Sequence, residues 1–337
     1  MKGRVNANTI TKKITNLVND ARQQIVKSIN QTIAHSYFEI GRLIVEEEQN
    51  GFEKADYGKF LLIELSRNLI KEFGKGFSVT NLKQMRQFYL SYSESVRCEI
   101  GQTVSDQFKL SWSHYLVLMR IDDKLERMFY ENEAVKNNWS IRELVRQYDS
   151  ALFTRLILSK DKNGILKLAQ KGQIFENPTD AVKDPYILEF IGLQEHNSYS
   201  ESDLEQRIID KLESFLLELG AGYTFVARQD RISFDEKHFR IDLVFYNRIL
   251  KCFVLVDLKV GELKHQDIGQ MQMYVNYYDR KVKLKEENKT IGIILCQNKS
   301  ESIVEYTLPE NNKQIFASKY LTILPSKESL QKIIELK

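Results

Sequence analysis

The sequence has few of the residues that cross-link a chain or anchor it in a membrane. Only three cysteines occur among 337 residues, at positions 98, 252 and 296, and none forms a CxxC pair. Scattered thiols of odd number argue against a disulfide framework and a cysteine zinc site, and they are typical of a reducing compartment. No apolar run approaches the ~20 residues that cross a bilayer, and the opening MKGRVNANTI lacks the apolar core of a secretory signal. We therefore expect a cytoplasmic protein with no membrane partner.

Proline is also scarce, and none of the four prolines precedes Pro178. Because proline breaks helix interiors, this absence permits long helices in the first half of the chain. Apolar residues recur there at three- and four-residue steps, which is typical of amphipathic helices. Gly74 suits a helix C-terminus, and Ser78 suits the N-cap of the next helix. We predict helices over residues 17–49, 56–74, 78–92, 111–121 and 140–158.

The pattern changes after a polar, turn-rich stretch, NPTDAVKDP, at residues 177–185. A helix is expected at 200–220, starting near Ser200 or Ser202 and ending at Gly220. The order of the segments that follow, α-β-β-β-α-β with that helix, predicts a mixed sheet. The expected strands lie at 223–234, 238–247, 250–260 and 290–297, with a helix at 266–282. We predict an α+β chain with two domains: an all-helical domain at 1–160, a linker region at 161–185 and an α/β domain at 186–337.

Charged residues interrupt two apolar strands in FRIDLVFYNRILKCFVLVDLKVGEL, residues 239–263. Side chains alternate faces along a strand, so Asp257 and Lys259 share one face. The preceding CFVLV is apolar at every position, as in a strand that is covered on both faces. A carboxylate in such surroundings is costly unless it is paired or bound to a metal.

The expected partner of Asp257 is Asp242 on the preceding strand. A two-residue turn at Arg248 and Ile249 sets Asp242 opposite Leu255, one diagonal step from Asp257 and within reach of a shared ion. Two carboxylates suit a hard divalent cation such as Mg²⁺ or Mn²⁺, which acidifies a bound water and neutralises charge on a phosphate. The residues therefore predict a metal-dependent phosphodiesterase site.

Asp242 followed by DLK on the adjacent strand resembles the PD-(D/E)xK nuclease superfamily, whose core has the same α-β-β-β-α-β order. Further segments are similar to the YhcG-like family of bacterial nucleases, and the similarity spans nearly the full chain. These segments are DYGK, GKGFSVTNLKQMRQFY, LSWSHY, SESDLEQRIIDKLESFLLELG, GQMQMYVNYYD and IGIILC. The resemblance implies a helical N-terminal domain and a C-terminal PD-(D/E)xK, restriction-endonuclease-like domain that acts as an endonuclease, most readily on DNA.

The resemblance also implies roles for individual positions. Asp242 and Asp257 match the metal-binding acids, and the backbone carbonyl of Leu258 is a further ligand. Lys259 matches the catalytic lysine. Glu205, on the helix before the sheet, matches an acid that often completes such sites, and Gln270 with Tyr274 matches a Q-xxx-Y pattern near the metal or DNA. The chain departs from the family pattern at Asp257, where a glutamate is expected, so this acid reaches about one methylene less.

Other interpretations of these residues stay open. Asp242 and Lys259 also fit a cross-strand ion pair on a solvated face, Glu205 fits an exposed helix position, and Tyr274 fits packing against the sheet. For function, the alternatives are a catalytically silent DNA- or protein-binding subunit of a defence or repair complex, and an RNase on the same scaffold. Binding without cleavage distinguishes the first, and comparison of DNA with RNA distinguishes the second.

The N-terminal helices offer a second site for nucleic acid. Residues 1–150 contain 22 Lys and Arg and 19 Asp and Glu, which is a small positive excess. Residues 151–337 contain 27 Lys and Arg (49 − 22) and 27 Asp and Glu (46 − 19), so their charges balance. Residues 60–92 read as helix, short turn and helix, with Leu82, Met85 and Tyr89 as an inner stripe. This unit fits an αα-hairpin with a solvated basic face. The alternative is a helix-turn-helix whose outward residues touch phosphates and bases, namely Lys75, Asn81, Lys83, Gln84 and Arg86. The long first helix could form a homodimer or bind a partner protein.

Overall fold

The computed structural model describes residues 7–50, 55–98, 108–157, 162–193 and 199–324. The chain divides into two compact units, Met1–Leu144 and Val145–Lys337. The first unit is helical and the second contains a mixed six-stranded sheet, which confirms the predicted α+β class. The predicted linker region at 161–185 contains helix α8 (Lys162–Lys171) and the 3₁₀ turn η3 (Pro178–Ala181).

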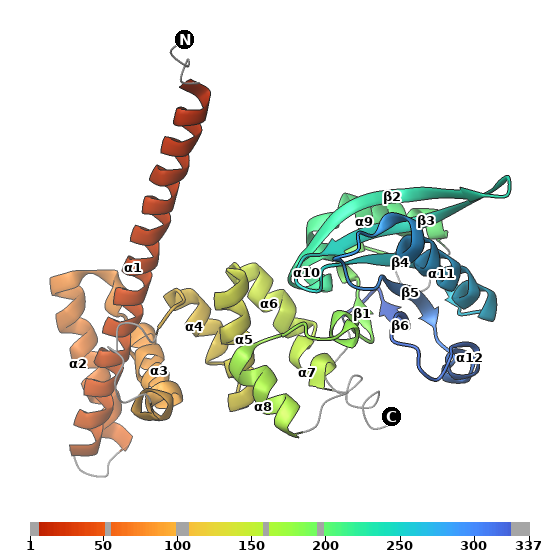
Figure 1. Cartoon of the computed structure of the whole chain (residues 1–337). Helices are drawn as coiled ribbons and strands as arrows, with labels where there is room; N and C mark the ends of the chain where they lie inside the picture. The colour runs from red at the N-terminus through yellow and green to blue at the C-terminus, as the bar shows by residue number, and fades with distance from the viewer. Residues whose placement is uncertain (1–6, 51–54, 99–107, 158–161, 194–198, 325–337) are drawn as a thin grey trace. The chain divides into compact units, whose positions relative to one another are not determined.

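The first unit is built from helices that follow the predicted apolar pattern (Figure 1). Gly74 has a φ of 88° directly after a helix, and the Ser78 hydroxyl accepts a hydrogen bond from the Asn81 amide at 3.3 Å. Both predicted helix ends are therefore confirmed. The elements are α1 (Ala7–Asn50), α2 (Ala55–Phe73), η1 (Lys75–Phe77), α3 (Val79–Cys98), α4 (Trp112–Leu118), α5 (Lys124–Asn137) and α6 (Ile141–Asp149), the last of which continues into the second unit.

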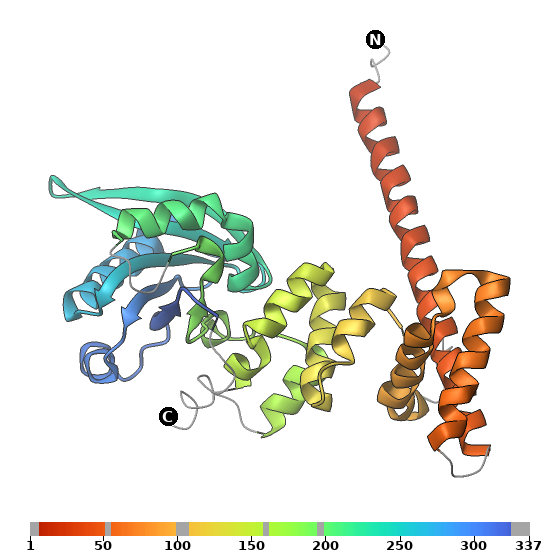
Figure 2. The same ribbon diagram turned by 180° about the vertical axis from the view of Figure 1, so that it is seen from behind.

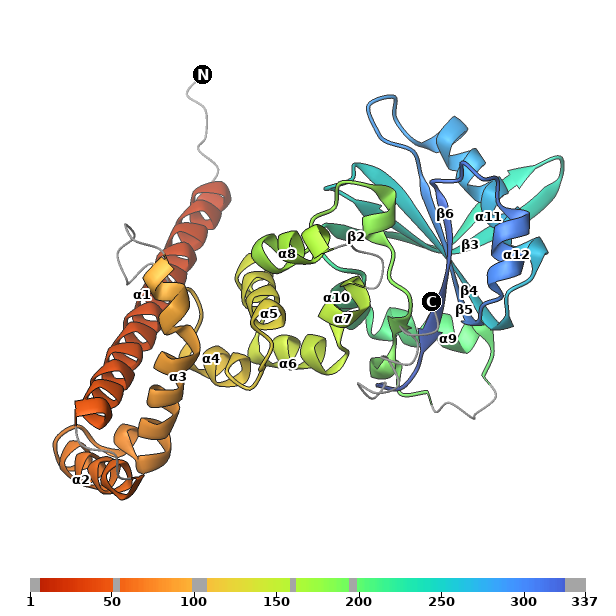
Figure 3. The ribbon, with the colours of Figure 1, turned by 90° about the horizontal axis from the view of Figure 1, so that it is seen from below.

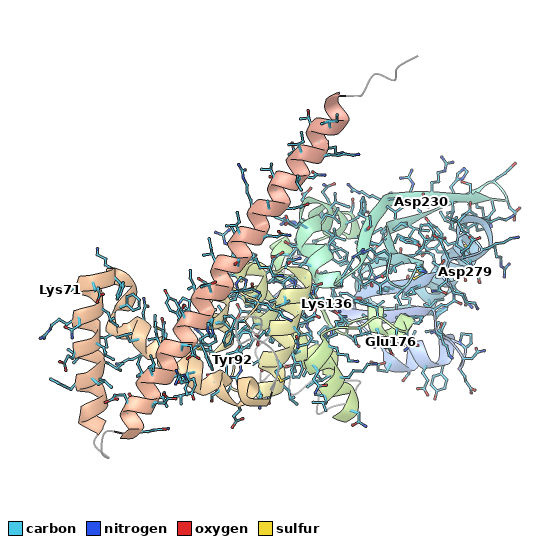
Figure 4. The ribbon with its side chains drawn as sticks, turned by 60° about the vertical axis from the view of Figure 1, so that its left-hand side comes forward. Lys71, Tyr92, Lys136, Glu176, Asp230 and Asp279 are labelled. Atoms are coloured by element: carbon cyan, nitrogen blue, oxygen red, sulfur yellow. The ribbon has the colours of Figure 1, made fainter. Side chains whose placement is uncertain are left out.

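Aromatic rings fill the core of the first unit around Phe88. The Phe88 ring centroid lies 4.9 Å from those of both Phe108 and Tyr115 and 5.1 Å from that of Tyr92, which Figure 4 labels. The inner stripe of α3 is thus Leu82, Met85 and Phe88. The predicted Tyr89 also faces α1, with its ring 5.1 Å from that of Phe38, but it lies at the edge of this contact and is only half-buried.

Two predicted helices are divided in the structure, and one observed helix of the first unit was not predicted. Ala151 has a φ of 49° and divides the expected helix at 140–158 into α6 and α7 (Leu152–Ile157). Lys211, with a φ of −119° and a ψ of 33°, also leaves the helical region and separates α9 (Glu201–Asp210) from α10 (Leu212–Leu219). Helix α5 was not expected, because its charged sequence presents only a narrow buried stripe; Asp123 caps it by accepting a hydrogen bond from the Glu126 amide at 2.7 Å.

The sheet of the second unit contains the predicted strands and two more at its edge. Its order is β1-β6-β5-β4-β3-β2; β2, β3 and β4 are antiparallel, whereas β4, β5, β6 and β1 are parallel. This confirms the mixed sheet. The bounds are β1 (Tyr186–Ile187), η4 (Glu189–Ile191), β2 (Tyr223–Phe234), β3 (Lys237–Asn247), β4 (Cys252–Glu262), α11 (His265–Tyr277), the π turn η5 (Tyr278–Val282), β5 (Ile291–Asn298), α12 (Glu301–Thr307) and β6 (Ile315–Leu321).

Helices cover both faces of this sheet. One core contains Phe215 of α10 and Leu204 of α9 with Val254 and Val256 of β4, and these helices lie in front of the sheet in Figure 2. The opposite core contains Met271 of α11 with Leu255 of β4, and Figure 3 shows α11 and α12 together on that side. The centre of β4 is therefore covered on both faces, as its continuous apolar run predicted.

Candidate active site

The β3–β4 connection brings Asp242 and Asp257 together, but with a register that differs from the prediction. The turn contains four residues, 248–251, rather than two. The Asn247 side chain holds it by accepting hydrogen bonds from the backbone amides of residues 249 and 250, each at 3.0 Å. Leu243 consequently pairs with Val256, so the next position along the ladder sets Asp242 opposite Asp257. The predicted pairing of Asp242 with Leu255 was wrong.

Asp257 is the most deeply buried acid of the site, with 2% of its side chain exposed. Its Oδ2 lies 2.9 Å from Nζ of Lys259, as expected for residues on one face of β4. Among the described residues, however, this oxygen has no partner with hydrogen-bond geometry. Burial, reinforced by the neighbouring Asp242 charge, raises the pKa of Asp257 to about 7. The single ammonium of Lys259 therefore does not fully offset burial and the second carboxylate, and an additional cation would stabilise the ionised pair.

The Asp242 side chain lies on β3 next to the Asp257 carboxylate. Its Oδ2 accepts a hydrogen bond from the Leu258 amide at 2.8 Å, and its Oδ1 accepts one from Gln229 Nε2 at 3.0 Å. Burial raises the pKa of Asp242, although these hydrogen bonds act in the opposite direction and lower it. The N–H and C=O of one strand residue point toward the same neighbouring strand, so the Leu258 carbonyl also lies on the β3 side of β4.

Glu205 of α9 is connected to Asp242 by hydrogen bonds that pass through a side chain of β2. It is buried, and its carboxylate accepts hydrogen bonds from Arg228 Nε and Gln229 Nε2. Gln229 thereby bridges Glu205 and Asp242, and its φ of 50° marks an irregular point in β2. Sequence reasoning did not find Arg228 or Gln229, because neither belongs to a recognisable spacing.

Lys259 is held by acids on both sides. Its side chain is 16% exposed, and Nζ lies 3.8 Å from Oε2 of Glu201 at the start of α9. Burial opposes the charge of Lys259, but the Asp257 carboxylate raises the pKa of the ammonium above its usual value. The lysine therefore stays protonated, and it presents a fixed positive charge beside the two aspartates.

The predicted pair on α11 also adjoins the site. Gln270 Nε2 donates a hydrogen bond to the Tyr274 hydroxyl, which donates in turn to the Arg240 carbonyl at 2.9 Å. Burial raises the pKa of Tyr274 to about 12, and Asp257 adds to this effect. Tyr274 thus fixes α11 to β3 two residues before Asp242.

These residues fit a divalent cation. Oδ2 of Asp257 is buried with no hydrogen bond from the described residues, and a second carboxylate faces it. The described residues contain no group of three or more acids, histidines or cysteines arranged to hold a metal. The ligands that the site would provide are the carboxylates of Asp242 and Asp257 and the carbonyl of Leu258. This set suits Mg²⁺, because this ion is commonly held by one or two carboxylates and keeps several waters.

The predicted nucleic-acid residues of the first unit divide into two groups. Lys75 and Lys83 are exposed. Asn81 and Arg86 are engaged within the unit: Asn81 Nδ2 donates to the Gly76 carbonyl at 2.9 Å, and Arg86 Nε lies 2.6 Å from Oε2 of Glu48. Gln84 is half-buried.

No helix in the described part of the chain has the length and apolar character that crossing a membrane requires.

Comparisons with known proteins identify the family of the chain. Residues 179–335 match the family model described as the YhcG PDDEXK nuclease domain, and residues 13–155 match the DUF1016 N-terminal domain. The chain is 38% identical over 341 residues to the Escherichia coli (strain K12) protein named "Putative nuclease YhcG", covering 94% of this chain and 90% of that protein.

Solved structures that match part of the chain include a repair endonuclease from Pyrococcus abyssi (TM-score 0.26, 17% identity, 37% of this chain) and EndoMS in a complex with dsDNA (TM-score 0.28, 14% identity, 40% of this chain). The matches span 49% and 51% of those two chains. The predicted resemblance is confirmed by the family models and by the identity over nearly the whole length: this chain belongs to the YhcG family, and its second unit contains a nuclease domain of the PDDEXK type.

Proposed function

We propose that this protein is a metal-dependent endonuclease that hydrolyses phosphodiester bonds in DNA. The supporting observation is the convergence of Asp242, Asp257 and Lys259, with one buried aspartate oxygen that has no hydrogen bond. Asp242, Asp257 and the Leu258 carbonyl would hold Mg²⁺ or Mn²⁺, and Glu205 would fix Asp242 through Gln229. The ion supplies an acidified water and charge neutralisation at phosphorus.

The protein's own side chains account for the remaining chemistry. Lys259 Nζ, fixed between Asp257 and Glu201, would donate hydrogen bonds to the attacking water or to a non-bridging phosphate oxygen. Such preorganised donors stabilise charge that develops in the transition state. Gln270 and Tyr274 would position β3 and the adjacent phosphate.

Removal of divalent metal should abolish cleavage. We expect no cleavage of DNA in EDTA and recovery with Mg²⁺ or Mn²⁺, because the two aspartates repel each other without a cation. The measurement is the initial rate on supercoiled plasmid, linear duplex, single-stranded DNA and RNA of matched sequence. Faster cleavage of RNA would favour an RNase on this scaffold. Binding without cleavage under every metal would favour a silent DNA- or protein-binding subunit.

We assign binding to the helical domain before residue 160 and hydrolysis to residues 186–337. Lys75 and Lys83, together with Gln84, would contact nucleic acid from the α2–η1–α3 helix-turn-helix. The buried thiols of Cys252 and Cys296 are free, which supports the cytoplasmic location proposed for the protein.

The first half of α1 supports a homodimer. Its apolar residues at helical spacing are exposed, among them Ile14 (55%), Leu17 (69%) and Ile25 (59%), whereas the buried residues of α1 begin at Ala34. Such a stripe is stabilised when it packs against a second copy. We expect light scattering to give twice the chain mass for the native protein and the monomer mass for Leu17→Glu/Ile25→Glu. An unchanged mass in the variant would exclude this face from the interface, and Lys12→Glu on α1 is the matched control.

A further inference from the structure

We propose that a groove between the β2–β3 hairpin and α11 binds unpaired nucleotides of the substrate next to the candidate active site. This inference rests on the proposed nuclease function and specifies its substrate class. The groove encloses about 730 Å³, and its lining includes Phe234 at the tip of the hairpin and Met273 and Tyr277 on α11. No residue of the lining is acidic, and Arg280 and Lys281 provide two positive charges.

The aromatic wall suits the flat face of a nucleobase. The Phe234 ring is stacked on Phe239, with centroids 5.2 Å apart and an interplanar angle of 24°. Tyr277 continues this arrangement at 6.4 Å and 30° from Phe234. Phe234 is 36% exposed, so part of its ring is available for contact. Aromatic rings bind single strands because unpaired bases expose their faces, whereas a duplex hides them within its own stack.

The groove has a fixed shape because α11 and η5, which follows it directly, are tied to both strands of the hairpin. The Tyr278 hydroxyl donates a hydrogen bond to Asp230 on β2 at 2.7 Å, and the Tyr274 hydroxyl donates to the Arg240 carbonyl on β3 at 2.9 Å. Figure 4 labels Asp230 on β2 and Asp279 near the end of the α11 segment, the two sides that these bonds connect. Because the groove is already formed, its side chains need little ordering when a ligand binds, and this lowers the free-energy cost of binding.

The position of the groove links it to the nuclease site. Gly269, Met273 and Tyr277 are spaced four residues apart and form one stripe of α11. Gln270 and Tyr274 form the neighbouring stripe, about 100° around the helix, and Tyr274 is bonded two residues before Asp242. A strand that occupies the groove would therefore continue toward the two aspartates.

Gly269 allows the groove to be filled without disturbing the fold. A Cβ at this position would meet no atom within 4 Å, and the glycine is helical, so a larger residue is tolerated and would project into the groove. Gly269→Leu is the blocking variant and Gly269→Ala is its matched control. Phe234→Ala removes the stacking ring. Arg280→Ala/Lys281→Ala removes two groove cations, and Lys289→Ala/Lys313→Ala removes two exposed cations that are not in the groove lining.

The test is fluorescence anisotropy of a labelled twenty-residue oligothymidylate and of a blunt duplex of equal length, in EDTA so that no cleavage occurs. We expect Gly269→Leu and Phe234→Ala to weaken single-strand binding about tenfold or more, the scale of one lost stacking contact, and to change duplex binding less than twofold. Gly269→Ala should bind like the native protein. Arg280→Ala/Lys281→Ala should weaken single-strand binding more than Lys289→Ala/Lys313→Ala does.

Equal losses for single strand and duplex, or no loss with Gly269→Leu, would overturn the groove proposal. Because binding is measured without metal, this outcome is independent of hydrolysis: a groove variant that binds normally overturns the inference while Mg²⁺-dependent cleavage still supports the nuclease. Conversely, groove-dependent binding by a protein that cleaves nothing would support the groove and remove the proposed catalytic function.

Discussion

Replacement of Lys259 with alanine should lower the rate of metal-dependent DNA cleavage by about two to three orders of magnitude, the usual effect of removing one preorganised donor from a transition state. The reason is geometric: Nζ is fixed 2.9 Å from Oδ2 of Asp257 and 3.8 Å from Oε2 of Glu201, so no mobile side chain replaces it. The measurement is the initial cleavage rate with Mg²⁺ and with Mn²⁺ at saturating DNA.

Two further variants make the Lys259 result specific. Lys259→Arg retains a positive charge but not the compact ammonium, so partial activity is expected. Lys313→Ala removes an exposed lysine of the same unit and should cleave at the native rate. Loss of Lys259 leaves Asp257 buried without its cation, so thermal unfolding must show that the variant is folded at the assay temperature. Equal cleavage by Lys259→Ala and the native protein would contradict the proposed mechanism.

Replacement of Glu218 with glutamine should destabilise the second unit by about 3–5 kcal/mol, the cost of breaking a buried ion pair from one side. The Glu218 side chain is fully buried, and its Oε1 lies 2.6 Å from Nη1 of Arg155, whose side chain is also fully buried. The same carboxylate accepts a hydrogen bond from the Ile187 amide at 3.1 Å. A glutamine would leave the Arg155 charge uncompensated inside the protein. The measurement is the free energy of unfolding in denaturant at pH 7.

The pH dependence of stability provides an independent test of Glu218. Burial opposes ionisation, but Arg155, Lys183 and Arg146 outweigh it and lower the pKa of Glu218 from 4.5 to about 2. A carboxyl with a lowered folded-state pKa contributes stability above its unfolded pKa and loses it as the pH falls toward the folded value. The native unit should therefore lose stability between about pH 4.5 and pH 2, and Glu218→Gln should lack this part of the loss. Glu213→Gln, an exposed acid on the same helix, should change neither quantity.

Most strands and helices follow from short-range patterns. The residues of β2 coincide with the predicted segment, and β3, β4 and β5 differ from it by a few positions, because alternation and apolar runs report burial directly. Helices α5, α8 and α12 and strands β1 and β6 were not expected. In α5 one of the buried positions is occupied by the charged residue Glu133, so the apolar periodicity that would predict a helix is interrupted.

The register of β3 against β4 shows why pairing is harder to predict than the strands themselves. A shift by one residue would exchange the two faces, so alternation excludes it. A shift by two residues retains every face, and alternation cannot distinguish the predicted Asp242–Leu255 pairing from the observed one. The turn decides between them, because Asn247 accepts hydrogen bonds from the amides of residues 249 and 250 and thereby stabilises a four-residue connection.

The sequence by itself determined the two-domain class, the strands of the hairpin and the three residues of the candidate site, because these depend on local periodicity and on the chemistry of the D-x-K spacing. Only the tertiary structure decided that Asp242 is set opposite Asp257, that Gln229 joins Asp242 to Glu205, and that α11 and the hairpin enclose a groove. These contacts join residues far apart in the chain, and their geometry depends on how the helices pack on a twisted sheet, which no local pattern records.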